Sequence, residues 1–196
     1  MHYRRLASLL LGAWLCGSLF LVAVATRNFG AVDEMLSAPG PEAAKQIQKI
    51  GKEQARMLLR HQASLQNLGV FENWERAQLA LGFLLLLALF FGVESRPSAL
   101  VFTLIMSAAV VFQHWLLTPE IAALGGLIEF IPSTVPAIER TRFWNYHTAY
   151  SITELVKLGL GLLLALGLLK RRRRSVRQLD SEIDTVDHAD HGHVDR

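Results

Sequence analysis

The chain has 196 residues, of which 52% are hydrophobic, and a formal net charge of +3. Its apolar residues gather in blocks of about 20, the length that a helix needs to cross the hydrocarbon of a bilayer. This distribution excludes an ordinary soluble domain, and the blocks lack the alternation of a membrane barrel. The single cysteine, Cys16, excludes an internal disulfide. We therefore predict an all-α, integral membrane four-helix bundle within residues 1–174.

The first predicted span covers residues 6–26 and follows two arginines. A cleaved signal peptide is the alternative, because an Ala-Val-Ala sequence before Thr26 has the small-x-small pattern of a cleavage site. A retained span is favoured, since the apolar stretch is longer than a usual signal core and contains the bulky Trp14 and Phe20. Cleavage would leave three spans and the same C-terminal side.

Residues 27–76 are polar and mixed in charge, with a turn at Pro39-Gly40-Pro41. The following residues recur at the three-to-four spacing of one helix face: Ile47, Ile50, Gln54, Met57, Leu58, His61, Leu65 and Leu68. They predict an amphipathic helix outside the membrane that packs on the bundle and leads into the second span. Binding of a protein partner or of the membrane interface through residues 42–76 is the open alternative.

The other three predicted spans cover residues 77–93, 98–117 and 146–169. The short link from Glu94 to Pro97 makes the second and third spans antiparallel neighbours. Pro119 is expected to disturb the helix just after the third span. Residues 118–142 are expected to form a loop with a short surface helix from Glu120 to Phe130.

A basic run after the fourth span is the predicted topology anchor: Lys170, Arg171, Arg172, Arg173 and Arg174. Lys and Arg beside a span stay on the cytoplasmic side, so the C-terminus is predicted to be cytoplasmic. Counting back through three reversals places the N-terminus there too. We predict a multi-pass protein of a bacterial inner membrane, whose partner is the lipid bilayer and not nucleic acid. The polar tail, residues 175–196, is predicted to be disordered.

Polar side chains inside spans are costly and suggest function. At about 1.5 Å per residue, Glu154 lies about 22 Å from the cytoplasmic end of the fourth span, and His114 lies roughly 24 Å along the third. Their similar depth predicts a polar cluster near the outer face. Its candidate members are Gln78, Gln113, His114, His147, Tyr150, Ser151, Glu154 and Lys157.

Three interpretations of this cluster remain open. The first is a structural network in which Glu154 pairs with Lys157 or a histidine. The second is an outward-facing site for a small molecule or a proton, with Glu154 and His114 as titrating groups. The third is a metal or haem site with His114 and His147 as nitrogen ligands, although no ligand spacing in the sequence supports it. No catalytic motif is found, so we expect a structural or accessory, non-enzymatic role and predict no cofactor.

Three short motifs accompany the order of the spans: Gly12-x-Trp14-x2-Gly17, Thr118-Pro119-Glu120-Ile121 and Arg142-Phe143-x3-His147. With them, most of residues 6–169 resembles the bacterial membrane proteins that carry domain of unknown function 4149, which look related to the transmembrane protein 205 group. The chain departs from the pattern at Tyr146, where that family tends to have Leu. The resemblance implies no established activity. Its layout is similar to the copper-resistance type D group and to haem-dependent membrane oxidases, which is why the metal or haem alternative is kept.

Overall fold

The structure is a computed structural model that describes residues 2–92, 97–128, 130 and 138–191, with side chains from Tyr3 to Leu169 within these ranges. The elements are α1 (His2–Ser37), α2 (Pro41–Ile50), α3 (Lys52–Gly92), α4 (Pro97–Phe112), the π-helix η1 (Gln113–Leu117), α5 (Thr118–Ile128) and α6 (Ile138–His191). Every one of these elements is helical, which confirms the predicted all-α fold.

Four helical stretches are long and apolar enough to cross a membrane: Tyr3–Ser37, Lys52–Gly92, Pro97–Ile128 and Ile138–Leu169. They contain the four predicted spans, apart from residue 93, which lies outside the described residues. The helices extend past the predicted spans. A helix makes its backbone hydrogen bonds within itself, so it does not have to end where the hydrocarbon ends. The chain is therefore a multi-pass membrane protein.

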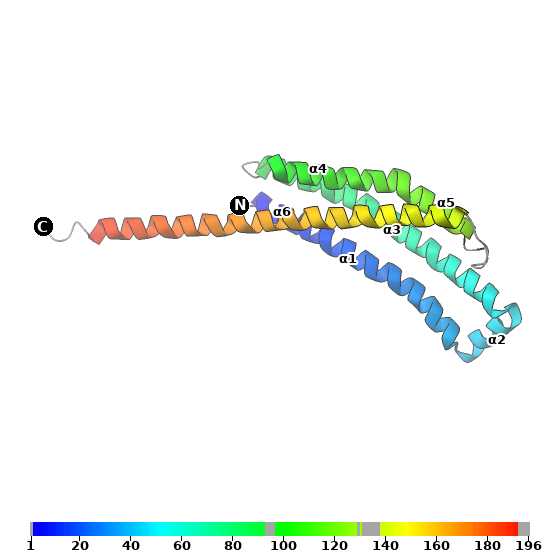
Figure 1. Ribbon diagram of the computed structural model, residues 1–196. Helices are drawn as coiled ribbons and strands as arrows, with labels where there is room; N and C mark the ends of the chain where they lie inside the picture. Colours follow the sequence, from blue (N-terminus) through cyan, green and yellow to red (C-terminus); the bar gives the residue numbers. More distant parts are fainter. Residues whose placement is uncertain (1, 93–96, 129, 131–137, 192–196) are drawn as a thin grey trace.

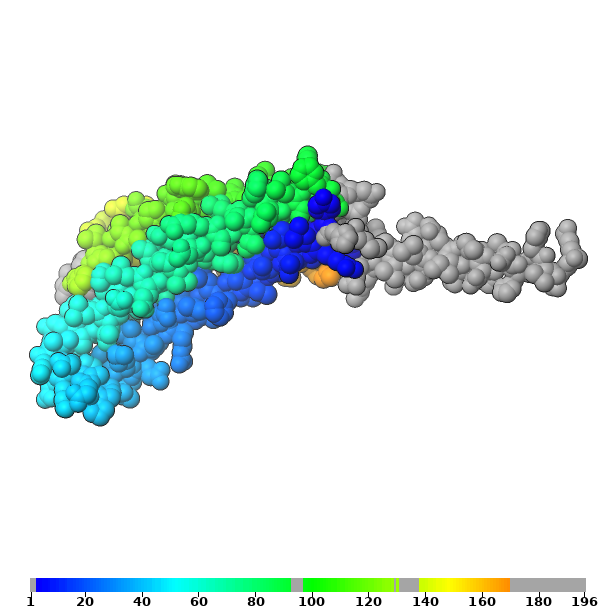
Figure 2. All heavy atoms as spheres, turned by 180° about the vertical axis from the view of Figure 1, so that it is seen from behind, coloured from blue at the N-terminus to red at the C-terminus, as the bar shows by residue number. Residues whose placement is uncertain are grey.

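The two ends of the bundle differ (Figure 1). At one end, which we call the proximal end, α1 and α4 begin and Arg4 Nη2 donates to the Leu168 carbonyl at 3.5 Å. α6 continues beyond this end. At the other end, the distal end, α1 and α3 project past the other helices, and α2 joins them into a hairpin (Figure 2).

The segment predicted to be a disordered tail, residues 175–196, is helical as far as His191. No Gly or Pro occurs between Leu168 and Gly192, so the helix of the fourth span can propagate without a new nucleation step. The side chains of the predicted anchor, Lys170 to Arg174, lie outside the described part of the chain, as do residues 192–196.

The distal hairpin has its own small apolar core, made of Val32, Leu36, Ala55 and Ala63. The predicted packing face of the extension is partly wrong, because Leu58 and Leu65 are 56% and 51% exposed. The small side chains of Ala55 and Ala63 are buried against α1 instead, since they let two helices approach closely. Gly51 adopts a φ of 86°, which suits glycine and forms the turn between α2 and α3.

Pro119 disturbs the helix as predicted, but the helix does not end there, so the loop predicted to begin at residue 118 is wrong. In η1 the Thr118 N–H bonds to the Gln113 carbonyl, five residues earlier, and α5 then continues the helix to Ile128. Proline lacks an N–H, and its ring crowds the carbonyl four residues earlier, at Trp115. The wider π turn accommodates this conflict, so the predicted surface helix is continuous with the span as far as Ile128.

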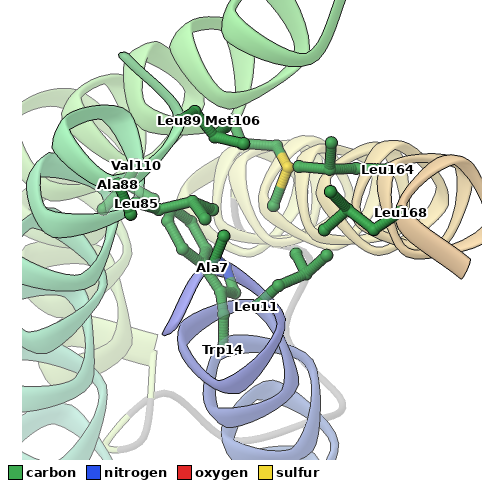
Figure 3. Packing of buried hydrophobic residues seen from close by; sticks show 10 residues of the cluster. All are labelled: Ala7, Leu11, Trp14, Leu85, Ala88, Leu89, Met106, Val110, Leu164 and Leu168. Carbon is green, nitrogen blue, oxygen red and sulfur yellow. The ribbon is translucent and has the colours of Figure 1, made fainter. Parts of the chain in front are cut away.

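An apolar core fills the proximal half of the bundle. Its buried members come from α1, α3, α4 and α6 (Figure 3): Ala7, Leu11, Trp14, Leu85, Ala88, Leu89, Met106, Val110, Leu164 and Leu168. Gly161 leaves room for Leu15 at a helix contact, because a Cβ there would stand 2.7 Å from Leu15 Cδ2. Close packing of apolar side chains thus holds this half together.

Candidate functional site

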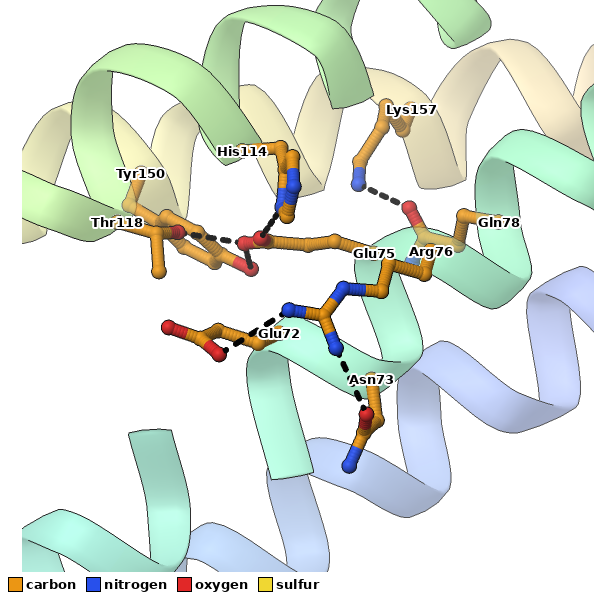
Figure 4. A network of polar contacts seen from close by, with 9 residues as sticks. All are labelled: Glu72, Asn73, Glu75, Arg76, Gln78, His114, Thr118, Tyr150 and Lys157. Atoms are coloured by element: carbon orange, nitrogen blue, oxygen red, sulfur yellow. Dashed lines mark hydrogen bonds and ion pairs between the residues drawn. The ribbon is translucent and has the colours of Figure 1, made fainter. Parts of the chain in front are cut away.

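Between the apolar core of the proximal half and the distal hairpin, the interior of the bundle is polar. We call this part the distal half, and Glu75 lies at its centre. Its side chain comes from α3 and is fully buried. Thr118 Oγ1 donates to Oε1 at 2.6 Å, and the Tyr150 hydroxyl donates to the same oxygen at 3.0 Å. His114 Nδ1 lies 2.9 Å from Oε2 (Figure 4). Three helical stretches therefore converge on one carboxylate.

Lys157 forms a second group, and its side chain is only 1% exposed. The ammonium Nζ bonds to Glu154 Oε2 at 2.7 Å and to Gln78 Oε1 at 2.6 Å. Gln78 Nε2 in turn donates to Ser18 Oγ at 3.2 Å. α1, α3 and α6 are joined through this group.

Gln113 links the two groups. Its Nε2 donates to Glu154 Oε2 at 3.3 Å and to the Tyr150 carbonyl at 3.3 Å. Gln113 and its neighbour His114 both lie in η1, so the wide turn before Pro119 presents one residue to Glu154 and the other to Glu75. We call the connected set the ionisable network: Ser18, Glu75, Gln78, Gln113, His114, Thr118, Tyr150, Glu154 and Lys157.

The depth of the network follows from helix geometry. At about 1.5 Å per residue, Gln78 lies roughly 21 Å from Gly92 at the proximal end of α3, and Glu75 lies roughly 25 Å from it. The hydrocarbon of a bilayer is about 30 Å thick. If the proximal end of the bundle marks one membrane surface, the network lies in the distal part of the hydrocarbon.

Two oxygens of the network accept no hydrogen bond. Gln113 Oε1 and Glu154 Oε1 are both buried and without a partner among the described residues. The Gln113 amide directs its Nε2 toward two acceptors, the Tyr150 carbonyl and Glu154 Oε2. Gln113 and Glu154 therefore contact each other through one hydrogen bond, and each has a second oxygen that lacks a donor.

Gly17 helps to position this site. A Cβ at Gly17 would collide with the indole of Trp74, the residue before Glu75. α1 therefore packs closely against α3 beside the network. Gly12 and Gly159 differ, because a Cβ added there would meet no described atom within 4 Å beyond its chain neighbours and its own helix backbone.

Six of the eight predicted cluster residues are in the network: Gln78, Gln113, His114, Tyr150, Glu154 and Lys157. The other two are not joined to it. The His147 ring stacks on Phe143 with 5.8 Å between the ring centroids, and Ser151 Oγ donates to the His147 carbonyl of its own helix. Helical spacing placed both residues at a suitable depth, but their side chains bond elsewhere.

Sequence reasoning missed Glu75, Thr118 and Ser18. Glu75 precedes the predicted start of the second span by two residues and thus falls in the segment, residues 27–76, predicted to lie outside the membrane. The spacing of Glu75 and Gln78 was an available signal, because residues three apart share a helix face. Thr118 was missed because the third span was expected to end at residue 117, before Pro119.

The metal and haem alternative gains no geometric support. His114 Nδ1 is engaged by Glu75, whereas His147 lies against Phe143 and Trp144. Among the described residues, no group of three or more His, Cys, Asp or Glu side chains is arranged to hold a metal ion.

Comparison with protein-family models, with curated proteins and with solved structures finds no match to this chain.

Proposed function

We propose that this chain is a non-enzymatic accessory protein of a bacterial inner membrane and that its ionisable network holds one proton. The supporting observation is a mismatch of charge. Glu75 and Glu154 supply two carboxylates, whereas Lys157 supplies one ammonium, and the remaining contacting group that can accept a proton is the His114 imidazole. One further proton would make the network neutral.

Neutrality matters because of where the network lies. An unpaired charge in hydrocarbon costs several kcal/mol or more, and burial in protein reduces this cost only in part. Glu75 is 0% exposed and Lys157 is 1% exposed, so water does not screen them. A proton on His114 or on one carboxyl group removes the excess negative charge. The protein would then respond to protons on the side toward which the distal half faces.

The proposed orientation places both termini in the cytoplasm and the hairpin outside. It rests on the basic run after Leu169 and on the two arginines before the first span. Reporter fusions after Arg174 should read cytoplasmic, and fusions at Gly40 should read outside. The reverse pattern would turn the site toward the cytoplasm and refute the proposed direction of proton access.

Infrared spectroscopy of the protein in lipid nanodiscs at pH 7 tests for the proton itself. Exposed Asp and Glu have ordinary pKa values of about 4, so they give no carboxylic-acid signal at this pH. We expect one signal from a buried carboxylic acid or an imidazolium ion. Glu75→Gln and Glu154→Gln should each abolish it, because either variant balances the charges.

Glu72→Gln is the matched control for this experiment. Glu72 lies one turn from Glu75 on the same helix, but it forms a surface ion pair with Arg76 at 3.5 Å. The control should keep the signal. Absence of any such signal from the wild-type protein would refute proton binding by the network.

A second candidate function is partner binding through residues 42–76. The observation that favours it is the exposed apolar face of the hairpin, where Leu58 and Leu65 are each more than half exposed. Crosslinking in intact membranes from photoreactive residues at these two positions should then give a discrete adduct, and from Glu53 on another face it should not. The resemblance to domain of unknown function 4149 stays a prediction beside both candidates.

A further inference from the structure

We infer that the proton is bound by Glu154 at Oε1 and that Gln113 is the acceptor that holds it there. This inference rests on the proposed function and names the group that carries the proton. It begins from the two unpartnered acceptors, Gln113 Oε1 and Glu154 Oε1. A proton on Glu154 turns one of these acceptors into a donor.

The contact already present favours this pairing. Gln113 Nε2 donates to Glu154 Oε2 at 3.3 Å. An amide and a carboxylic acid can form two antiparallel hydrogen bonds, N–H to C=O and O–H to C=O, because each group carries a donor beside an acceptor. The carboxylate form of Glu154 can make only the first bond. Uptake of one proton from water supplies the missing donor, and no other bond is made or broken.

Glu75 is a poorer place for the proton. Its Oε1 already accepts from Thr118 and Tyr150, and its Oε2 lies against His114 Nδ1. With a neutral imidazole that carries its hydrogen on Nδ1, both oxygens of this carboxylate accept at least one hydrogen bond. Neither Glu75 nor His114 then needs an additional proton.

The charges around Glu154 are compatible with a neutral form. Lys157 lies 2.7 Å away on α6, and Tyr150 lies one turn earlier on the same helix. Glu75 of α3 and His114 of η1 contact each other and Tyr150 contacts Glu75, so these groups belong to the same network. Protonation leaves Lys157 paired in charge with Glu75 and still bonded to Gln78 at 2.6 Å. A sodium ion in the same place would instead add a second full positive charge beside the ammonium.

Two conservative variants locate the proton. Gln113→Leu removes the acceptor of the proposed bond, whereas Thr118→Val removes a donor that contacts only Glu75. In infrared spectra at pH 7, we expect Gln113→Leu to shift the carboxylic-acid C=O stretch to higher frequency and Thr118→Val to leave it unchanged. If Gln113→Leu does not assemble, Gln113→Asn keeps the amide, shortens its reach and should give the same shift.

The outcomes separate this inference from the proposed function. A C=O signal that shifts with Thr118→Val and not with Gln113→Leu would place the proton on Glu75 and overturn the inference alone. An imidazolium signal without a carboxylic-acid signal would place it on His114, with the same consequence. Sodium-dependent thermal stabilisation that is lost in Glu154→Gln would identify a metal cation as the ligand and overturn the inference. No protonated group at all would refute both claims.

Discussion

The proximal and distal halves of the bundle solve the same packing problem differently. The proximal half is held by apolar side chains such as Leu85, Met106 and Leu164. The distal half holds acids, a lysine and amides in hydrogen-bonded contact, centred on Glu75 and Lys157. Apolar contacts would serve in both places, so the polar half indicates a requirement beyond packing.

The energetics support this distinction. Interhelical hydrogen bonds in membrane bundles contribute only about 0.6 kcal/mol on average. Replacing a buried ion pair by well-packed apolar residues is often neutral or stabilising. A network of this size is therefore an inefficient way to stabilise a bundle. Its presence is better explained by its charge, which can change with one proton, than by its contribution to stability.

The largest expected effect is that of Lys157→Met. Loss of the ammonium leaves two buried carboxyl groups without a cation, and breaking a buried pair typically costs about 3–5 kcal/mol. Unfolding titrations in mixed micelles should show this loss of stability, and the infrared signal should grow toward two carboxylic acids. Lys45→Met is the control, because Lys45 is 65% exposed on α2. Unchanged stability and an unchanged signal in Lys157→Met would contradict the charge count.

Leu85→Ala should act on the proximal half alone. Leu85 is fully buried, and Leu→Ala substitutions in cores cost about 2–5 kcal/mol. The lower part of this range is expected, because lipid offers an apolar side chain much the same environment as the bundle. Leu84→Ala, at a neighbouring residue that is 46% exposed, should have little effect. A change in the infrared signal of Leu85→Ala would show that the two halves are not independent.

Gly17→Ala should cause a smaller loss, of roughly 1–2 kcal/mol, as overpacking does at tight contacts. The added methyl group would displace Trp74 beside Glu75. Tryptophan fluorescence should report the displacement. Gly12→Ala, on the same helix but with open space around it, should leave both stability and fluorescence unchanged. Equal behaviour of the two variants would mean that α1 does not approach α3 closely at the network.

Thr118→Val should have the smallest effect, about 0.6 kcal/mol, which is the average for one interhelical hydrogen bond in a membrane. Tyr150 still donates to the same oxygen of Glu75 in this variant. Thr153→Val is the control, because Thr153 bonds only to the Ala149 carbonyl of its own helix. A loss several times larger in Thr118→Val would assign the network a mainly structural role.

The spans and the all-α fold could be predicted from the sequence, because about 20 apolar residues in lipid have few alternatives to a helix. Depth along the helices also predicted most of the network. Rotation about the helix axis could not be predicted in the same way. The exposed Leu58 and the buried Ala55 show the difficulty, since close approach of α1 favoured the smaller side chain over the more apolar one.

Local backbone adjustment was a second limit. Pro119 normally interrupts a helix, and the expected break separated Thr118 from the third span. The π turn of η1 absorbs the proline and thereby aims Gln113 and His114 at two different acids. Such a turn depends on whether neighbouring helices offer hydrogen-bond partners to the side chains that it reorients. That information is tertiary and is not present in the local sequence.

The most direct measurement is the number of protonated glutamates in the unmodified protein at pH 7. Carbon-13 labelling of glutamate side-chain carboxyl groups distinguishes a carboxylic acid from a carboxylate by chemical shift in nanodisc samples. We expect one neutral glutamate, with all other glutamates ionised. A spectrum with every glutamate ionised, and no imidazolium ion at His114, would contradict the proposal that the distal half of the bundle holds a proton.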